Sequence, residues 1–410
     1  MNFIDIVFFV YTFVALYMIV LMIIIYLSNR GRMFNYPKGK IEPVSIVMSC
    51  WNAKHNIGNA VDRMFSLDWP KDKLEVIVVD DCSTDGSQQV IKEYAKKYKN
   101  FKYILRKKNS GGAATPQNDG IRIAKNDYIA VADDDSFPES DALKKMIGFL
   151  QKDKKVGAVT CSVLVKKPKK FIEKIQAIEY VVISFGRRLL DFVDSVYVTP
   201  GPFALYRKKT LIEVGLFDKD NMTQDIEIVY NLMSKGYKAR MALDARVYVD
   251  SPKKLRGWWR QRVRWNIGGT QTLIKYKNKL FRNGMLGLFV IPFFSSSLFI
   301  GVFGIGLFLY LTIRRVIATY FTTTYSVSAG TALFSLSDIS FNPTVLNYFG
   351  FALFLLGSFY IFFGIITMRE WKKRYINFYS MIIFLTVYLT LFPLNLIDAL
   401  FRMAIGKYSW

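Results

Sequence analysis

The sequence predicts an α/β domain with a mixed, mostly parallel sheet, attached to helices that span a membrane. Between residues 43 and 135, short apolar runs alternate with amphipathic stretches. This alternation is typical of a parallel sheet that is covered by helices on both faces. Near both ends of the chain, the apolar runs are long enough to cross a bilayer core of ~30 Å.

The N-terminal apolar run, residues 6–27, predicts an uncleaved membrane anchor. It contains no charged side chain and is followed by four basic residues, Arg30, Arg32, Lys38 and Lys40. Basic residues flank the cytoplasmic ends of spans, and the run lacks the basic start and small-residue cleavage site of a signal peptide. We therefore expect residues 1–40 to form an anchor and a basic linker whose C-terminal end is cytoplasmic.

The C-terminal region, residues 284–410, predicts about three further spans, at 284–311, 345–368 and 376–401. The basic cluster of residues 369, 372, 373 and 374 separates the last two and predicts a cytoplasmic loop. Arg314 and Arg315 would lie outside, and Pro393 interrupts the last block. Segment 316–342 is rich in Ser, Thr and aromatic residues, which favours an outer loop or a partly re-entrant segment.

Composition excludes several classes of protein. The three cysteines lack metal-ligand spacing, and His55 is the single histidine, so neither a disulfide framework nor a zinc site is expected. The net charge of +24 does not indicate nucleic-acid binding, because basic residues at a cytoplasmic surface can bind anionic lipids and anionic donors instead. Membrane lipids are expected partners, nucleic acid is not, and oligomeric state is not indicated.

The central region, residues 41–250, is the predicted α/β domain. Buried strands are expected at 44–49, 74–79, 101–105 and 128–132. Helices are expected at 55–66, 86–97 and 113–125. Because ligands of such sheets bind beyond the carboxyl ends of the strands, the residues at these ends are the candidate site.

Carboxylates cluster at two of these strand ends. Asp80 and Asp81 follow one strand and exceed what helix capping needs, so they can bind hydrogen-bond donors of a base or ribose. Residues 133–135, three consecutive aspartates, follow another, where their mutual repulsion favours Mg²⁺ or Mn²⁺. A solvated acidic turn is the alternative for this second cluster.

Two further motifs lie downstream. Asp225 occupies the first turn of a predicted helix, and from this motif alone a carboxylate that interacts with the helix dipole is the better interpretation. On another helix, Gln261, Arg264 and Trp265 share one face. Arginine can hold phosphate through two hydrogen bonds, and an indole offers a flat surface to a sugar. This helix, within segment 251–283, is also expected to lie at the membrane interface.

In this order, the motifs resemble family 2 glycosyltransferases, especially membrane-integrated hyaluronan, chitin and cellulose synthases. The resemblance covers roughly residues 43–269 and implies a cytoplasmic, Rossmann-like GT-A fold in a multi-pass protein of the cell membrane. It implies donor binding by Asn52, Asp80, Asp81, Asp133, Gln261 and Arg264. It implies a metal ligand in Asp135, a catalytic base in Asp225, and acceptor binding by Gly201, Phe203, Gln224 and Trp265.

Three positions depart from the family pattern and leave the donor's identity open. The first strand is followed by Asn52-Ala53 where Asn-Glu is usual, Gly111-Gly112-Ala113 lacks the usual Lys, and Gln224 replaces a Glu. A nucleotide-sugar donor, with UDP favoured, remains expected, because the base and the metal site are retained.

The predicted reaction is a single displacement with inversion, in which Asp225 takes a proton from the acceptor hydroxyl while the metal and Arg264 stabilise the leaving diphosphate. The expected acceptor is a growing polysaccharide, whose synthesis is coupled to translocation. A channel for it needs a polar or aromatic lining, and the last two blocks offer Asn347, Tyr348, Tyr360, Tyr379, Tyr388 and Asn395. For each of these residues, an ordinary interfacial or packing role is the alternative. The alternatives are transfer of one sugar to a membrane lipid and, in another class, a transporter or receptor with a nucleotide-sensing domain.

Overall fold

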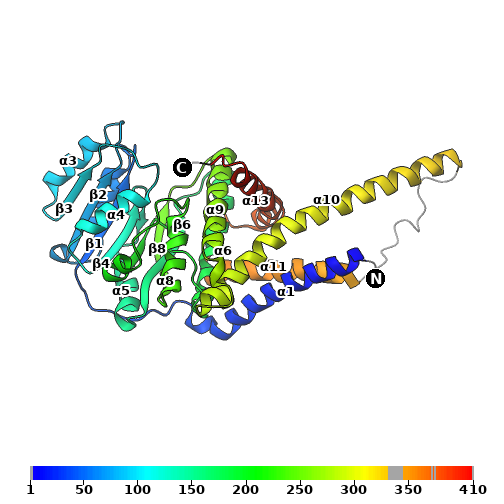
Figure 1. Ribbon diagram of the computed structural model, residues 1–410, viewed down its shortest axis with the longest axis horizontal. Helices are drawn as coiled ribbons and strands as arrows, with labels where there is room; N and C mark the ends of the chain where they lie inside the picture. The colour runs from blue at the N-terminus through cyan, green and yellow to red at the C-terminus, as the bar shows by residue number, and fades with distance from the viewer. Residues whose placement is uncertain (1–2, 331–344, 371–372, 374, 409–410) are drawn as a thin grey trace.

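The computed structural model describes residues 3–330, 345–370, 373 and 375–408, and divides into a sheet-containing part and a bundle of long helices (Figure 1). The sheet-containing part lies at one end of the long axis. Helices α1, α10 and α11 extend from it toward the other end, and α10 reaches farthest (Figure 1).

The sheet has eight strands in the order β3-β2-β1-β4-β7-β6-β8-β5. β7 and β5 are antiparallel to their neighbours, and the other pairs are parallel, so the predicted mixed, mostly parallel sheet is confirmed. The strands are β1 (Val44–Cys50), β2 (Leu74–Asp80), β3 (Phe101–Leu105), β4 (Tyr128–Asp133), β5 (Phe137–Pro138), β6 (Val156–Val165), β7 (Ala204–Arg207) and β8 (Lys238–Val249).

Alternate side chains of a strand enter two different cores, because a strand's side chains point to opposite faces. In β1, Ile46 and Met48 belong to the core with α2 and α5, whereas Val47 belongs to the core with α4, α6 and α8. The helices that cover the two faces are α2 (Ile57–Phe65), α3 (Ser87–Lys97), α4 (Ala114–Ile123), α5 (Ala142–Lys152), α6 (Phe171–Asp191), α7 (Lys208–Glu213) and α8 (Gln224–Ser234).

Among the described residues, four helical segments are long and apolar enough to cross a membrane: Ile6–Arg32, Leu286–Ser328, Gly350–Thr367 and Tyr379–Ala404. Their helices are α1 (Phe3–Asn29), α10 (Ile291–Ser328), α11 (Val345–Thr367), α12 (Phe378–Ile383) and α13 (Leu389–Ala404). α13 stays beside α9 (Leu255–Lys275) and does not reach the far end of the bundle (Figure 1).

One expectation is wrong over part of its length. Segment 316–342 was expected as an outer loop or re-entrant segment, but α10 continues as helix through Ser328. Hydroxyls of Thr322, Thr324 and Ser328 donate to main-chain carbonyls four residues earlier, so polar side chains are satisfied within the helix. Residues 331–344, like 372 and 374 of the basic cluster, lie outside the described part.

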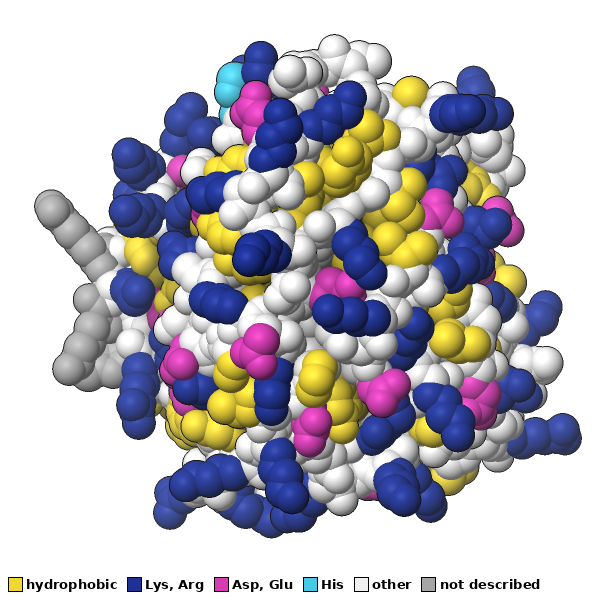
Figure 2. Space-filling view, turned by 90° about the vertical axis from the view of Figure 1, so that its left-hand side faces the viewer, with side chains coloured by type: hydrophobic (Ala, Val, Ile, Leu, Met, Phe, Trp, Pro, Cys, Tyr) yellow, Lys and Arg dark blue, Asp and Glu magenta, His cyan; other side chains and the backbone are white. Residues whose placement is uncertain are grey.

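Lys and Arg side chains are spread over the face of the α/β part that points away from the long helices, with fewer Asp and Glu among them (Figure 2). Much of the positive charge therefore lies on a solvated surface distant from the apolar bundle.

Candidate active site

A cavity of about 750 Å³ opens at the carboxyl edge of the sheet. Residues that follow β1, β2 and β4 line one side of it, and side chains of α6, α8 and α9 line the other. This is the edge where ligands of parallel sheets bind. The cavity gathers the predicted residues Asp81, Asp133, Asp135, Gly201, Gln224, Asp225, Gln261, Arg264 and Trp265.

The aspartates that end β4 form a crowded acidic wall. Burial, followed by the charge of Asp135, raises the pKa of Asp134 to about 7. Burial and the charge of Asp250 raise the pKa of Asp135 to about 6, and burial raises the pKa of Asp133 well above its ordinary value. Burial and mutual repulsion therefore disfavour the charged forms of these aspartates, and a bound cation would favour them.

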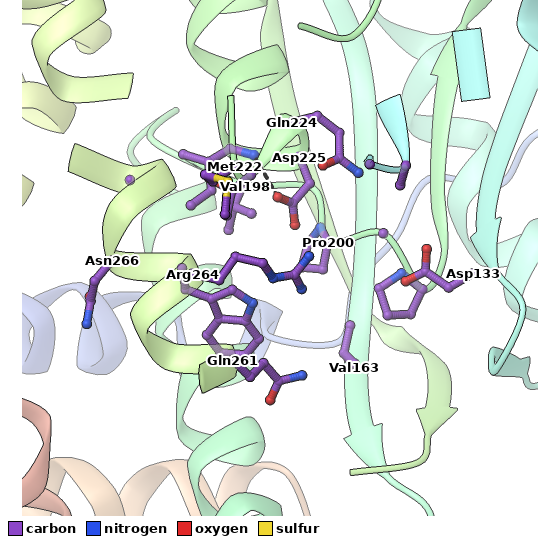
Figure 3. A pocket seen from close by; sticks show the side chains of 18 of the residues that line it. Asp133, Val163, Val198, Pro200, Met222, Gln224, Asp225, Gln261, Arg264 and Asn266 are labelled. Atoms are coloured by element: carbon purple, nitrogen blue, oxygen red, sulfur yellow. Dashed lines mark hydrogen bonds between the residues drawn. The ribbon is translucent and has the colours of Figure 1, made fainter. Parts of the chain in front are cut away.

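Asp225 and Arg264 point toward the middle of the cavity from two different helices (Figure 3). Asp225 lies in the first turn of α8, where Thr223 is the residue before the helix. The main-chain carbonyl of Asp225 accepts hydrogen bonds from the Thr199 N–H at 3.1 Å and from its hydroxyl at 3.3 Å. Burial raises the pKa of the Asp225 carboxyl, and the positive charge of Arg264 opposes this rise.

The close approach of α9 to α8 fixes the position of Arg264 and Trp265 relative to Asp225. A Cβ added to Gly268 of α9 would lie 2.0 Å from the Thr223 hydroxyl oxygen, so only glycine fits there. At the C-terminal end of α9, Lys275 forms a 2.5 Å ion pair with Glu227, which is fully buried. These contacts couple α8, which carries Asp225, to α9, which carries Arg264 and Trp265.

At the other end of the cavity, Asp81 is held by its neighbours. One carboxylate oxygen pairs with Arg106 Nε at 2.8 Å, and the other accepts from the Ser110 N–H at 2.9 Å and its hydroxyl at 2.8 Å. Asp80 and Asn52 do not line the cavity. Asp80 accepts from the Ser83 N–H at 3.0 Å, and the Asn52 side chain accepts from the Thr84 N–H at 2.9 Å. Both shape the loop behind Asp81.

The loop before β7 separates two predicted acceptor residues. Gly201 lies against Asp133, because a Cβ at Gly201 would be 2.9 Å from the Asp133 carboxylate. Phe203 is fully buried in the hydrophobic core and does not line the cavity. Of this pair, the structure brings only Gly201 to the site.

Several cavity residues were not predicted. Asp250 follows β8 at the same sheet edge, so the strand-end argument would have found it had this strand been considered. Trp51, directly after β1, lines the cavity and has an exposed fraction of 59%. Arg187 and Tyr197 come from α6 and the loop after it, and no sequence signal separates Arg187 from its neighbour Arg188.

The cavity extends to the apolar helices. Phe294, Ser297 and Leu298 of α10 and Phe392 of α13 line this end. The expected channel residues are elsewhere: Tyr348 and Tyr379 are exposed, Tyr360 packs on Phe185, and Asn395 is buried against α9. The side chains of Asn347 and Tyr388 lie outside the described residues.

The aspartates of the acidic wall can bind a divalent ion only together with oxygen atoms of a bound ligand. No group of three His, Cys, Asp or Glu side chains among the described residues could hold a metal ion by itself. Mg²⁺ is commonly held by one or two carboxylates together with phosphate oxygens of the substrate. Asp135 and the nearby Asp133 can supply these one or two carboxylates.

Comparisons with known proteins indicate the family that this chain resembles. Residues 45–215 match the model of glycosyl transferase family 2. A poly-beta-1,6-N-acetyl-D-glucosamine synthase of Staphylococcus epidermidis is 28% identical over 366 residues, 89% of this chain and 83% of the relative. A synthase of the same name from Staphylococcus aureus is 28% identical over 299 residues, 72% of each chain.

Among solved structures, a mannosyltransferase from Pyrobaculum calidifontis in complex with GDP-Man and Mn²⁺ has the same fold. Its TM-score is 0.61 at 19% identity, and 99% of each chain is covered.

The fold, the cavity and the apolar helices thus define a membrane-bound glycosyltransferase. Residues 45–215 match glycosyl transferase family 2, and this match confirms the resemblance that the motifs predicted.

Proposed function

We propose that this enzyme extends a polysaccharide of N-acetylglucosamine, using a UDP-activated donor at the cytoplasmic side of the cell membrane. The names of the staphylococcal relatives, which align over most of both chains, support the sugar and the polymer. The basic residues after α1 and across the distal face of the α/β part support the cytoplasmic placement.

The observation that carries the proposal is the continuity of the cavity. One space runs from Asp81, at the donor end, past Asp225 to Phe294 and Phe392 on the apolar helices. A sugar added beside Asp225 can therefore move toward the membrane without leaving the cavity, as synthesis coupled to translocation requires.

In the proposed reaction, the carboxylate of Asp225 accepts the proton of the acceptor hydroxyl as its oxygen attacks the anomeric carbon. The bond from that carbon to the donor phosphate breaks, and the configuration inverts. Arg264 stabilises the negative charge that develops on the leaving diphosphate, and Gln261 lies one turn before it. A divalent ion, Mg²⁺ or Mn²⁺, held by Asp135 would neutralise the diphosphate when bound.

The remaining site residues act by binding. Asp81 faces the nucleoside, with Asp80 and Asn52 supporting its loop, and Asp133 lies beside the diphosphate. Trp265, Gln224 and Gly201 border the acceptor, and Phe203 holds the Gly201 loop in the core.

A second candidate function is transfer of one sugar to a membrane lipid. The apolar side chains at the membrane end of the cavity favour it, because an acyl or prenyl chain could lie against Phe294, Leu298 and Phe392.

The donor is tested by incubating the purified protein in lipid nanodiscs with UDP-N-acetylglucosamine, UDP-glucose or GDP-mannose and measuring nucleoside diphosphate release. We expect turnover of UDP-N-acetylglucosamine, and turnover of GDP-mannose alone would contradict the proposal.

A further inference from the structure

A buried arginine in the cavity forms no hydrogen bond and no ion pair within the described part of the chain. Arg187 of α6 is 5% exposed and lines the cavity. Its Nε and Nη1 atoms are buried without a hydrogen bond to any described residue. A buried charge is retained at a cost unless something pairs with it. The missing partner is therefore expected to be a ligand.

Arg188, the next residue of α6, has a structural role and can be compared with Arg187. Arg188 is equally buried, at 4% exposed. Its guanidinium binds the carboxylate of Asp191 at 2.5 Å and the main-chain carbonyls of Arg32, Asn35 and Met241. Arg188 therefore fastens α6 to the chain that follows α1, whereas Arg187 contributes no such bond.

Arg187 lies toward the membrane end of the cavity. The ionisable groups that act on its charge are Tyr197, Cys161 and Asp225. The ring of Tyr197 packs on Phe294 of α10, with 4.0 Å between the ring centroids. The proposed nucleoside residue, Asp81, lies at the other end of this space, so Arg187 is placed for the acceptor and not for the nucleotide.

The surroundings of Arg187 suit a sugar ring. Its planar guanidinium presents several N–H donors in a fixed arrangement. The aromatic side chains of Tyr197, Tyr180 and Trp265 line the same cavity and offer flat faces to a ring. Hydrogen-bond donors beside aromatic faces are the combination that orients a polar ring in a largely apolar pocket.

We propose that Arg187 binds the terminal sugar of the acceptor by donating hydrogen bonds to its hydroxyl or acetamido oxygens, and thereby holds the attacking hydroxyl beside Asp225. This inference rests on the proposed function, because it takes the acceptor to be a carbohydrate. Arg187 is then an acceptor-binding residue that none of the sequence motifs contains.

The test measures the KM for a short β-1,6-linked N-acetylglucosamine oligosaccharide at saturating UDP-N-acetylglucosamine, UDP affinity by calorimetry, and the melting temperature. The variants are Arg187→Met, which removes the charge, Arg187→Lys, which keeps it without the guanidinium, and Arg188→Met as the matched control. All are full-length chains in the same nanodiscs.

Arg187→Met should raise the acceptor KM about ten-fold or more, because hydrogen bonds from a charged donor are lost. Its UDP affinity should stay within about two-fold of wild type. Its melting temperature should equal or exceed that of wild type, because an unpaired buried charge is removed. Arg187→Lys should have an intermediate KM. Arg188→Met should melt at a lower temperature, with the acceptor KM of the folded enzyme unchanged.

An unchanged acceptor KM in both Arg187 variants, with wild-type enzyme elongating the oligosaccharide, would overturn this inference alone. An equal weakening of UDP binding would place Arg187 in the donor site and also overturn it. A wild-type enzyme that transfers sugar to a polyprenyl phosphate but never to the oligosaccharide would overturn both this inference and the proposed polymer function.

Discussion

The guanidinium of Arg262 lies 4.1 Å from the centre of the Trp265 ring. The same guanidinium binds the carboxylate of Glu179 on α6 through Nε at 2.7 Å and Nη2 at 2.5 Å, and both side chains are 2% exposed. Neither Arg262 nor Glu179 lines the cavity. The orientation of Trp265, which borders the proposed acceptor, therefore depends on an ion pair behind the cavity wall.

Breaking this pair should affect both stability and elongation. Glu179→Gln leaves Arg262 charged and buried, so we expect a loss of unfolding free energy on the order of 3 kcal/mol, measured by thermal unfolding. The polymer should also become shorter, because Trp265 loses its support. Lys144→Gln is a suitable control, since it breaks an ion pair with Asp68 whose side chains are 40% and 62% exposed. It should cost less than about 1 kcal/mol. Equal effects of the two changes would contradict this account of Trp265.

The base is tested by Asp225→Asn, which keeps the size of the side chain but cannot accept the proton. We expect kcat to fall on the order of 10²–10⁴-fold, with nucleotide affinity little changed. Asp225 also lies in the first turn of α8, where a carboxylate contributes at most about 1 kcal/mol of stability. Turnover that survives this change would show that Asp225 serves only the helix.

Much of the fold and site could be predicted from the sequence, because strands that are buried on both faces are continuous apolar runs whose ends can be located. β1, β2 and β4 end within one residue of expectation, and Asp81, Asp133 and Asp135 line the cavity. The position of a strand end could not separate Asp81 from Asp80, because adjacent residues of an extended chain point opposite ways. Arg187 was missed because pairing, which distinguishes it from Arg188, is a property of the folded chain.

The acidic wall predicts an unusual dependence of stability on pH. The ordinary pKa of Asp134 and Asp135 is 3.8, and the folded protein raises these values to about 7 and about 6. Between the ordinary pKa and the raised pKa of each group, the folded state binds more protons than the unfolded state. The contribution of these groups to the free energy of unfolding is therefore fully present at low pH and is lost as pH rises through about 6 and about 7.

At high pH, a bound divalent ion would neutralise the carboxylates that have lost their protons. We therefore expect Mg²⁺ to raise the melting temperature more at pH 8 than at pH 5, and EDTA to abolish turnover. Asp135→Asn should remove most of this pH-dependent gain. The same gain at both pH values, or full activity in excess EDTA, would argue against an ion at the acidic wall.

The topology is tested with single cysteines in a chain whose own three cysteines have been replaced. Cysteines at Lys152 and Lys235, on the α/β part, should resist an impermeant thiol reagent in intact cells. A cysteine at Ser328, at the end of α10 distant from the sheet, should react and serves as the positive control. Labelling at position 152 but not at position 328 would contradict the predicted topology and would place the α/β part outside the cell.

The size of the product tests the central claim most directly. Purified enzyme is given saturating radiolabelled UDP-N-acetylglucosamine in nanodiscs, and the product is sized over time by gel filtration before and after lipid extraction. We expect a long, water-soluble polymer that appears early while most acceptors remain unextended, and a shorter polymer from Trp265→Ala. A product that stays a lipid carrying one sugar, however long the incubation, would contradict the polymer function and favour the lipid transferase.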